Sequence, residues 1–233
     1  MPYRNVKHIF FDLDHTLWDF EKNSEEALGE IISQCREYCD FRFTIDEFLD
    51  VYKPLNVLMW KLYRENKITK NELRIRRFSD ALDHFGISDL GVANHMAYAY
   101  VSISPRKTNL FPHAMEALEY LNERYKLHII TNGFEEIQFT KLKMSNIEVF
   151  FDEVITSEAI GVKKPDPLIF SYALEKTGAK PHESLMIGDN YEADILGALN
   201  SKMPAIYFNM DQKNELHANV RQITNLKELT SFL

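Results

Sequence analysis

The sequence HIFFDLDHT at residues 8–16 decides the fold that we expect for this chain. Its first four residues form a continuous, mostly apolar run, which is typical of a parallel strand buried on both faces. The run ends at Asp12, and a second carboxylate follows at Asp14. Because open α/β sheets build their sites at the carboxyl ends of strands, this acidic pair predicts chemistry there. Taken alone, Asp14 and Thr16 would also fit an ordinary helix cap or turn.

Segments of the same kind recur downstream, separated by helical patterns. The further strand-like segments lie at residues 127–131, 153–156, 184–188 and 204–208. The helical patterns between them lie at residues 112–124, 135–144, 167–177 and 191–200. Strands that alternate with helices are joined by right-handed crossovers, so we expect an α/β fold: a doubly wound, Rossmann-like parallel sheet covered by helices on both faces.

Residues 20–104 interrupt this alternation, because they show helical periodicity and no convincing strand. We therefore expect an all-helical domain at 20–104, inserted into a core made of residues 1–19 and 105–233. The insertion begins just after the acidic strand end, so we expect it to act as a cap over the site.

Composition narrows the function classes. The chain has 233 residues, is 45% hydrophobic, and carries 35 acidic against 27 basic residues, for a net charge of −8. The hydrophobic content excludes a disordered chain, and the negative net charge argues against a nucleic acid polymer as partner. A local pocket for a small anion is still compatible with this charge. No apolar run approaches the roughly 20 residues that span a membrane. Because Cys35 and Cys39 form no disulfide framework, we expect them to be small buried residues of one helix in a cytoplasmic protein.

Three further groups of polar residues follow strand-like segments. They are TNGF at residues 131–134, GVKKPDP at 161–167 and GDNYEAD at 188–194. Each has an ordinary explanation by itself: an Asn-Gly turn, a solvated basic loop, and acids that complement a helix N-terminus. Together they indicate a shared site, because all of them lie where parallel strands end.

If the first strand lies between the strands that precede Thr131 and Asp189, the four groups meet in one crevice. Asp12, Asp14 and Asp189 would then form an oxygen-rich site that best matches Mg²⁺. The polar side chains Thr131, Asn132 and Lys164 would balance a phosphate. One carboxylate could attack phosphorus, while its neighbour carries the proton.

At this point the chain resembles the haloacid dehalogenase-like phosphohydrolases, over its whole length and in the order of the four motifs. The resemblance implies that Asp12 is the nucleophile and that Asp14 is the general acid and base, with its backbone carbonyl on Mg²⁺. It implies that Thr131 and Asn132 hold the phosphoryl oxygens and that Lys164 stabilises Asp12 and the phosphate. It further implies that Asp189 ligates Mg²⁺, and that Asp194 either ligates the ion directly or holds the groups that do.

Two positions depart from the pattern or leave it ambiguous. The family's lysine usually precedes the proline directly, so we assign that role to Lys164 and not to Lys163. The usual glycine after Asp14 is replaced by His15, which we interpret as local turn chemistry or a substrate contact. Dehalogenases of the family lack an acid at the position of Asp14, so this residue favours phosphoryl transfer over 2-haloacid dehalogenation. Sugar phosphatases and phosphomutases stay open as alternatives.

The insertion resembles the cap of the YjjG-type pyrimidine 5′-nucleotidase branch. Asn56, Trp60 and Tyr63 lie at roughly helical spacing, so one helix could present them to a nucleobase. The plainer alternative is that Trp60 and Tyr63 pack cap helices together. The resemblance implies a small phosphorylated metabolite as the partner, with a nucleoside 5′-monophosphate as the expected substrate.

Two non-enzyme alternatives use the same residue types. A phosphorylation-switched receiver domain also combines acids, a threonine and a lysine, but it has no helical insertion after its first strand. A catalytically inactive binding module would have no reason to keep the complete set of acids, threonine and lysine.

Overall fold

The computed structural model describes residues 3–210 and 220–233. The chain divides into two compact units, one made of Met1–Phe20 and Thr108–Leu233, the other of Glu21–Lys107. We call them the α/β unit and the helical unit. None of the described helices is long and apolar enough to cross a membrane.

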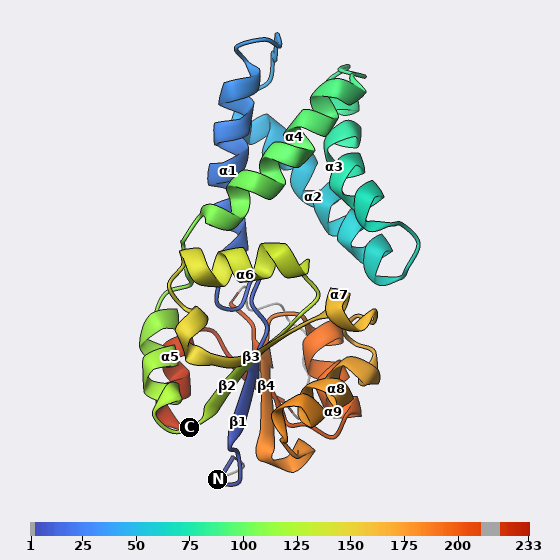
Figure 1. Ribbon diagram of the computed structural model, residues 1–233. Coiled ribbons are helices and arrows are strands. Elements are labelled where there is room, and N and C mark those ends of the chain that lie inside the picture. The colour runs from blue at the N-terminus through green and yellow to red at the C-terminus, as the bar shows by residue number, and fades with distance from the viewer. Residues whose placement is uncertain (1–2, 211–219) are drawn as a thin grey trace. The chain divides into compact units, whose positions relative to one another are not determined.

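The α/β unit is built on a parallel sheet of six strands in the order β3-β2-β1-β4-β5-β6 (Figure 1). The strands are β1 (His8–Phe11), β2 (Lys126–Thr131), β3 (Phe151–Thr156), β4 (Ser184–Gly188), β5 (Ala205–Phe208) and β6 (Arg221–Ile223). Strand β1 pairs with β2 on one side and β4 on the other, as the sequence predicted. The short edge strand β6 was not predicted, because only one of its three residues is buried.

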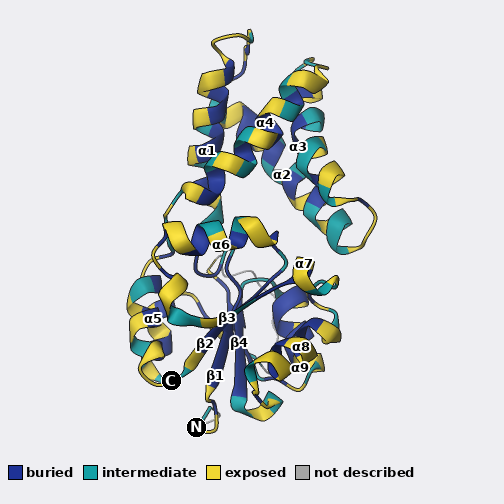
Figure 2. Cartoon of the chain, viewed as in Figure 1, coloured by how far each residue is buried: buried dark blue, intermediate teal, exposed yellow. Residues whose placement is uncertain are grey.

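Helices cover both faces of the sheet, which confirms the predicted doubly wound α/β fold. They are α5 (Ala114–Asn122), α6 (Glu135–Met144), α7 (Ser157–Ile160), α8 (Pro167–Thr177) and α9 (Gly197–Asn200). Side chains of a strand alternate between its faces, so Ile9 and Phe11 join the apolar cluster that includes α5, while Phe10 joins the cluster of α8 and α9. Figure 2 shows β1 and β4 buried along their lengths, between helices that expose their outer sides.

The predicted helix at 191–200 has an irregular start. Residues Tyr191–Leu196 form a π-helical turn, and α9 continues from it. The side chain of Asn190 caps the turn by accepting a hydrogen bond from the Ala193 N–H at 2.9 Å. Wide turns of this kind occur frequently at functional sites, and this one carries Asp194.

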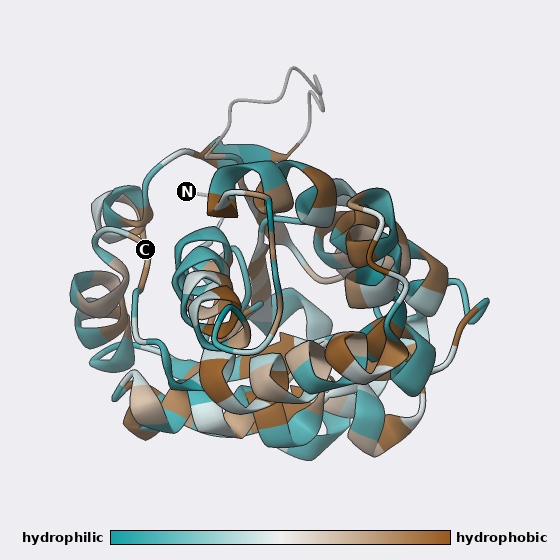
Figure 3. Ribbon diagram, turned by 90° about the horizontal axis from the view of Figure 1, so that it is seen from above, coloured by the Kyte–Doolittle hydropathy of each residue, from teal (hydrophilic) through white to brown (hydrophobic). Residues whose placement is uncertain are grey.

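The helical unit contains the helices α1 (Phe20–Cys35), α2 (Ile45–Arg64), α3 (Lys70–His84) and α4 (Leu90–Ile103). Thr44 and Thr69 begin α2 and α3 as reciprocal capping boxes with a glutamate three residues later. The helices carry both hydrophobic and hydrophilic residues (Figure 3), and their apolar stripes meet in a separate core. Helix α1 ends at Cys35, which is buried as expected, so the expectation that Cys39 shares a helix face with it is wrong. Cys39 is also only partly buried, because it lies in the turn that follows the helix.

Candidate active site

The carboxyl ends of the three central strands bring the predicted residues to one edge of the sheet. Asp12 directly follows β1, Thr131 is the last residue of β2, and Asp189 directly follows β4. Because β1 lies between β2 and β4 in parallel register, these three residues leave the sheet on the same side.

Lys164 is the buried cation of this edge. It lies between α7 and α8 with 1% of its surface exposed. Its Nζ is 2.6 Å from Asp12 Oδ1 and 2.6 Å from Asp194 Oδ1, and it donates to the Ile130 carbonyl at 2.6 Å. Burial acts to lower the pKa of Lys164, but the charges of Asp12 and Asp194 outweigh burial and raise that pKa. The Lys164 side chain therefore stays charged. The neighbouring Lys163, in contrast to the fully buried Lys164, is only partly buried.

Asn132 ties the loop after β2 to the lysine loop. Its Oδ1 accepts a hydrogen bond from the Lys164 backbone N–H at 2.7 Å, and its Nδ2 donates to the Lys164 carbonyl at 3.0 Å. Both the oxygen and the nitrogen of the Asn132 amide are therefore hydrogen-bonded to the Lys164 backbone. A contact between Asn132 and a phosphate would have to use its backbone N–H or displace these bonds.

Thr131 is buried with 1% of its surface exposed. Its hydroxyl accepts a hydrogen bond from the Gly133 N–H at 3.0 Å. A hydroxyl carries one hydrogen as well as its acceptor lone pairs, so Thr131 can still donate to an anionic oxygen.

Asp12, Asp189 and Asp194 form the carboxylate cluster of the site. One oxygen from each lies within 4.8 Å of the others. Burial, followed by neighbouring carboxylate charges, raises the pKa of Asp12 well above its ordinary value and that of Asp189 to about 7. Such an excess of negative charge beside one lysine is what a divalent cation relieves, and a set of hard oxygen donors suits Mg²⁺.

Two small features support this cluster. The Thr16 hydroxyl donates to Asp189 Oδ1 at 3.3 Å, and the Asn190 N–H donates to Asp194 Oδ2 at 3.0 Å. A Cβ atom at Gly188 would lie 2.4 Å from Asp194 Oδ2, so the glycine leaves the space that the Asp194 carboxylate occupies.

The Asp14 carboxylate does not join the cluster, although the sequence had grouped it with Asp12 and Asp189. Its Oδ1 is 2.5 Å from Lys141 Nζ, and its Oδ2 accepts a hydrogen bond from Gln138 Nε2 at 3.0 Å. Both donors come from α6. The third carboxylate of the cluster is Asp194 instead, because the π-helical turn brings it toward Gly188.

His15 has a positive φ of 63°, a conformation that glycine adopts at little cost. This explains why a glycine is usual at this position and supports local turn chemistry. The His15 ring packs on Phe20, with the ring centroids 4.6 Å apart.

Residues 6–202 match the family model described as haloacid dehalogenase-like hydrolase. The chain belongs to this family.

Curated members of the family with different substrates in their names are similarly close to this hydrolase. It is 33% identical to the pyrimidine 5′-nucleotidase PynA of Streptococcus pneumoniae over 87% of this chain and 84% of that protein. It is 31% identical to the pyrimidine 5′-nucleotidase YjjG of Escherichia coli over 97% and 96%. It is also 31% identical to a glyceraldehyde 3-phosphate phosphatase of Methanothermobacter thermautotrophicus over 96% and 99%.

A solved structure shares the whole fold of the hydrolase. The HAD-hydrolase YfnB from Bacillus subtilis, determined bound to magnesium, superposes with a TM-score of 0.86 at 26% identity, covering 97% of each chain. The YfnB structure reveals a movement between its domains.

The three residues expected to contact a base lie on α2 of the helical unit. Asn56 is buried, and its Oδ1 accepts a hydrogen bond from Arg77 Nη1 of α3 at 3.0 Å. Trp60 and Tyr63 are partly exposed and pack edge to face, with ring centroids 5.8 Å apart. The aromatic pair therefore contacts itself, and the Asn56 amide already has a cationic partner.

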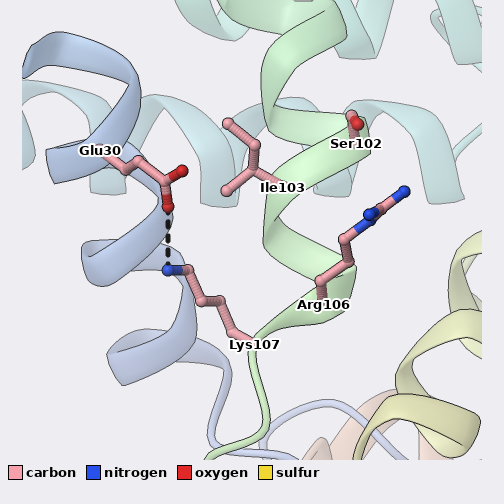
Figure 4. Close-up of a pocket in the computed structure, with 5 residues that line it drawn as sticks. All are labelled: Glu30, Ser102, Ile103, Arg106 and Lys107. Atoms are coloured by element: carbon pink, nitrogen blue, oxygen red, sulfur yellow. Dashed lines mark hydrogen bonds and ion pairs between the residues drawn. The ribbon is translucent and has the colours of Figure 1, made fainter. Parts of the chain in front are cut away.

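The helical unit also contains a pocket near the end of α4 (Figure 4). It is lined by Glu30, Ser102, Ile103, Arg106 and Lys107. Glu30 and Lys107 form an ion pair at 3.1 Å, and Arg106 points away from this pair (Figure 4). The lining includes none of the residues predicted to bind substrate, so the pocket is not assigned to the hydrolase site.

The sequence pattern did not assign Gln138, Lys141 or Arg77 to a site, and it indicated only a turn for Thr16. Gln138 and Lys141 lie one helical turn apart on α6, which directly follows the Thr131 loop. This spacing is a signal that could have drawn attention to them, but many surface helices carry the same residue types.

Proposed function

We propose that this hydrolase cleaves phosphomonoesters through an aspartyl-phosphate formed on Asp12. The observation that carries the proposal is the buried Lys164, paired with both Asp12 and Asp194 at the carboxyl end of the central strand. A fixed ammonium beside a carboxylate offsets the repulsion that a phosphate dianion meets there. An inactive binding module would not require this arrangement.

In the first half-reaction, an oxygen of Asp12 attacks phosphorus. Lys164 contacts Oδ1, which leaves the second carboxylate oxygen for the attack. The new bond joins this oxygen to phosphorus, while the bond from phosphorus to the leaving oxygen breaks. The leaving oxygen keeps the electron pair and takes a proton from Asp14, acting as general acid.

In the second half-reaction, a water attacks the phosphorus of the aspartyl-phosphate, and Asp14 takes a proton from that water. The bond between phosphorus and the Asp12 oxygen breaks, its electron pair stays on that oxygen, inorganic phosphate is released, and the Asp12 carboxylate is regenerated. Thr131 donates its hydroxyl hydrogen to a phosphoryl oxygen, and Asn132 keeps Lys164 in place.

Asp12, Asp189 and Asp194 would hold Mg²⁺, with the backbone carbonyl of Asp14 as a further ligand. When bound, the ion supplies positive charge that neutralises the phosphoryl oxygens and the carboxylates. The magnesium bound to YfnB supports this choice of metal.

We further propose nucleoside 5′-monophosphates as substrates, with pyrimidine nucleotides preferred. The names of PynA and YjjG support this choice. The residues at the strand ends would contact only phosphate and metal, so selection of the leaving portion is left to other residues. We assign it to the helical unit acting as a cap, with Asn56, Trp60 and Tyr63 as the candidates.

A second candidate function is hydrolysis of small sugar phosphates. The identity of 31% with a glyceraldehyde 3-phosphate phosphatase favours it as much as the identity with YjjG favours a nucleotide. The same reacting residues would serve either substrate, because the chemistry at phosphorus does not change.

A phosphate-release screen tests the proposal. The purified protein is assayed with uridine 5′-monophosphate, glyceraldehyde 3-phosphate and p-nitrophenyl phosphate, with Mg²⁺ or with excess EDTA. We expect hydrolysis with Mg²⁺ and none in EDTA, because the phosphate would then enter a cluster of uncompensated carboxylates. Activity in EDTA would contradict the metal site, and a preference for glyceraldehyde 3-phosphate would replace the nucleotide assignment. No release from any substrate would contradict the reaction itself.

A further inference from the structure

The Asp14 carboxylate is held at both of its oxygens by α6. Lys141 Nζ lies 2.5 Å from Oδ1, and Gln138 Nε2 donates to Oδ2 at 3.0 Å. The two donors are three residues apart, so they project from the same face of the helix. Two contacts on two oxygens fix the direction of a carboxylate as well as its position.

Lys141 is itself buried and surrounded. Only 3% of its surface is exposed. Its Nζ lies 4.1 Å from the centroid of the Trp18 ring and 5.7 Å from that of Phe20. A desolvated ammonium between a carboxylate and aromatic faces cannot move into water without losing these contacts. Trp18 is fully buried in the same loop as Asp14, so both the donor and the acceptor are anchored.

Gln138 connects Asp14 to the phosphate loop. Its side chain is 1% exposed and passes over Gly133. A Cβ atom at Gly133 would lie 2.0 Å from Gln138 Nε2, the atom that donates to Asp14. The glycine next to Asn132 is therefore needed for the reach of Gln138.

We infer that Lys141 and Gln138 are positioning residues that aim the Asp14 carboxylate for proton transfer. The inference rests on the proposed phosphomonoester hydrolysis, in which Asp14 is the acid and base. Proton transfer requires close and directed contact with the leaving oxygen, so a carboxylate free to rotate would be a poorer acid and base. Neither Lys141 nor Gln138 has to touch the substrate for this role.

The role predicts a loss that depends on the leaving group. We expect Lys141→Met to lower kcat for uridine 5′-monophosphate about 100-fold, with KM changed less than about threefold. For p-nitrophenyl phosphate, whose leaving group needs little protonation, we expect a loss of about tenfold or less. Lys141→Arg restores a charged donor and should recover much of the loss. Gln138→Ala should show the same selectivity at about tenfold.

Lys143→Met is the matched control, since Lys143 is exposed on the same helix. The decisive measurement is the double variant Asp14→Asn/Lys141→Met. Because Lys141 acts through Asp14, the Lys141 substitution should cost less than about twofold in the Asp14→Asn background. Thermal unfolding of each variant shows whether it is folded. If Lys141→Met does not fold, the comparison of the two substrates is made with Gln138→Ala instead.

If the wild type releases phosphate and Asp14→Asn is selective for the nucleotide, but neither positioning variant is selective, the inference is wrong and the proposed function stands. Full additivity in the double variant would show that Lys141 acts independently of Asp14, and it would also overturn the inference. If the wild type hydrolyses none of the substrates, the proposed function fails, and the inference fails with it.

Discussion

The two compact units bury their cationic side chains in different surroundings. In the α/β unit, Lys164 contacts Asp12 and Asp194, and Lys141 contacts Asp14. Each buried ammonium therefore faces carboxylates at 2.5 to 2.6 Å. Removing one partner of such a pair leaves a charge without compensation in a buried place.

In the helical unit, the buried Arg77 contacts side chains that carry no formal charge. It donates to the neutral amide of Asn56 at 3.0 Å, and its guanidinium lies 4.6 Å from the Tyr100 ring centroid and 5.4 Å from that of Phe78. These contacts of Arg77 include no carboxylate, so its charge is stabilised by a dipole and by ring faces and not by a charge of opposite sign. The α/β unit therefore balances its buried ammonium groups with charges of opposite sign, whereas the helical unit balances Arg77 with an amide dipole and ring faces.

The largest effect should come from the nucleophile. Asp12→Asn removes the attacking oxygen, so we expect turnover of every substrate to fall by at least about 10⁴-fold. The loss should be equal for uridine 5′-monophosphate and p-nitrophenyl phosphate, because both substrates need the same attacking oxygen. Steady-state phosphate release measures both. A variant that keeps activity on one of the two substrates would contradict the role of Asp12 as the nucleophile for both.

The next effect separates the two neighbouring lysines. We expect Lys164→Ala to lower kcat about 10³-fold and to reduce the free energy of unfolding by about 3–5 kcal/mol, because Asp12 and Asp194 lose their cation. Lys163→Ala, its matched control, should change each quantity little. Kinetics and urea unfolding of the two variants decide between them. If Lys163→Ala is the inactive variant, the assignment of the lysine is off by one residue.

A smaller effect, and one that depends on substrate, is expected in the helical unit. If Trp60 stacks on a base, Trp60→Ala should lower kcat/KM for uridine 5′-monophosphate about tenfold and leave p-nitrophenyl phosphate nearly unchanged. Tyr98→Ala is the control, since Tyr98 is an exposed aromatic residue of α4. Equal losses on both substrates, with a lower melting temperature, would show that Trp60 only packs against Tyr63 and its surroundings.

A last effect concerns stability and pH, and it does not involve the reaction. His128 in β2 is 1% exposed, and its Nε2 lies 3.0 Å from His8 Nδ1. Burial, followed by the nearby His8, lowers the pKa of His128 to about 4. The unfolded chain, with a histidine pKa of about 6.5, therefore binds this proton first as the pH falls. Folding should lose up to about 3 kcal/mol between pH 6.5 and pH 4, with no further loss from this group below pH 4.

Urea unfolding at several pH values measures this loss. His128→Phe should flatten the dependence between pH 6.5 and pH 4, whereas the control His182→Phe, at an exposed position, should leave it as in the wild type. An unchanged slope in His128→Phe would show that buried carboxylates, and not the histidine pair, set the acid limit of the α/β unit.

Most of the sheet and much of the site could be predicted from local patterns. The buried runs that precede Asp12, Thr131 and Asp189 mark strands by hydrophobicity alone, and a loop residue before a proline drew attention to Lys164. Helices 135–144 and 167–177 were predicted with the bounds that the structure has. The strand β6 and the π-helical turn were missed, because neither has a hydrophobic period that differs from that of a loop or a regular helix.

The sequence by itself determined which residues stand at the carboxyl ends of the strands. Parallel strands place these ends on one edge, so knowing the strands was enough to bring Asp12, Thr131 and Asp189 together. Only the tertiary structure decided that the Asp194 carboxylate, which the resemblance had placed at the metal directly or behind it, lies in the cluster itself, and that the Asp14 carboxylate faces Lys141. Lys141 is 127 residues from Asp14 along the chain, and its contact depends on the side-chain directions of a helix packed beside the loop. Hydrophobic periodicity specifies which face of a helix is buried, but it does not specify which carboxylate a buried lysine meets.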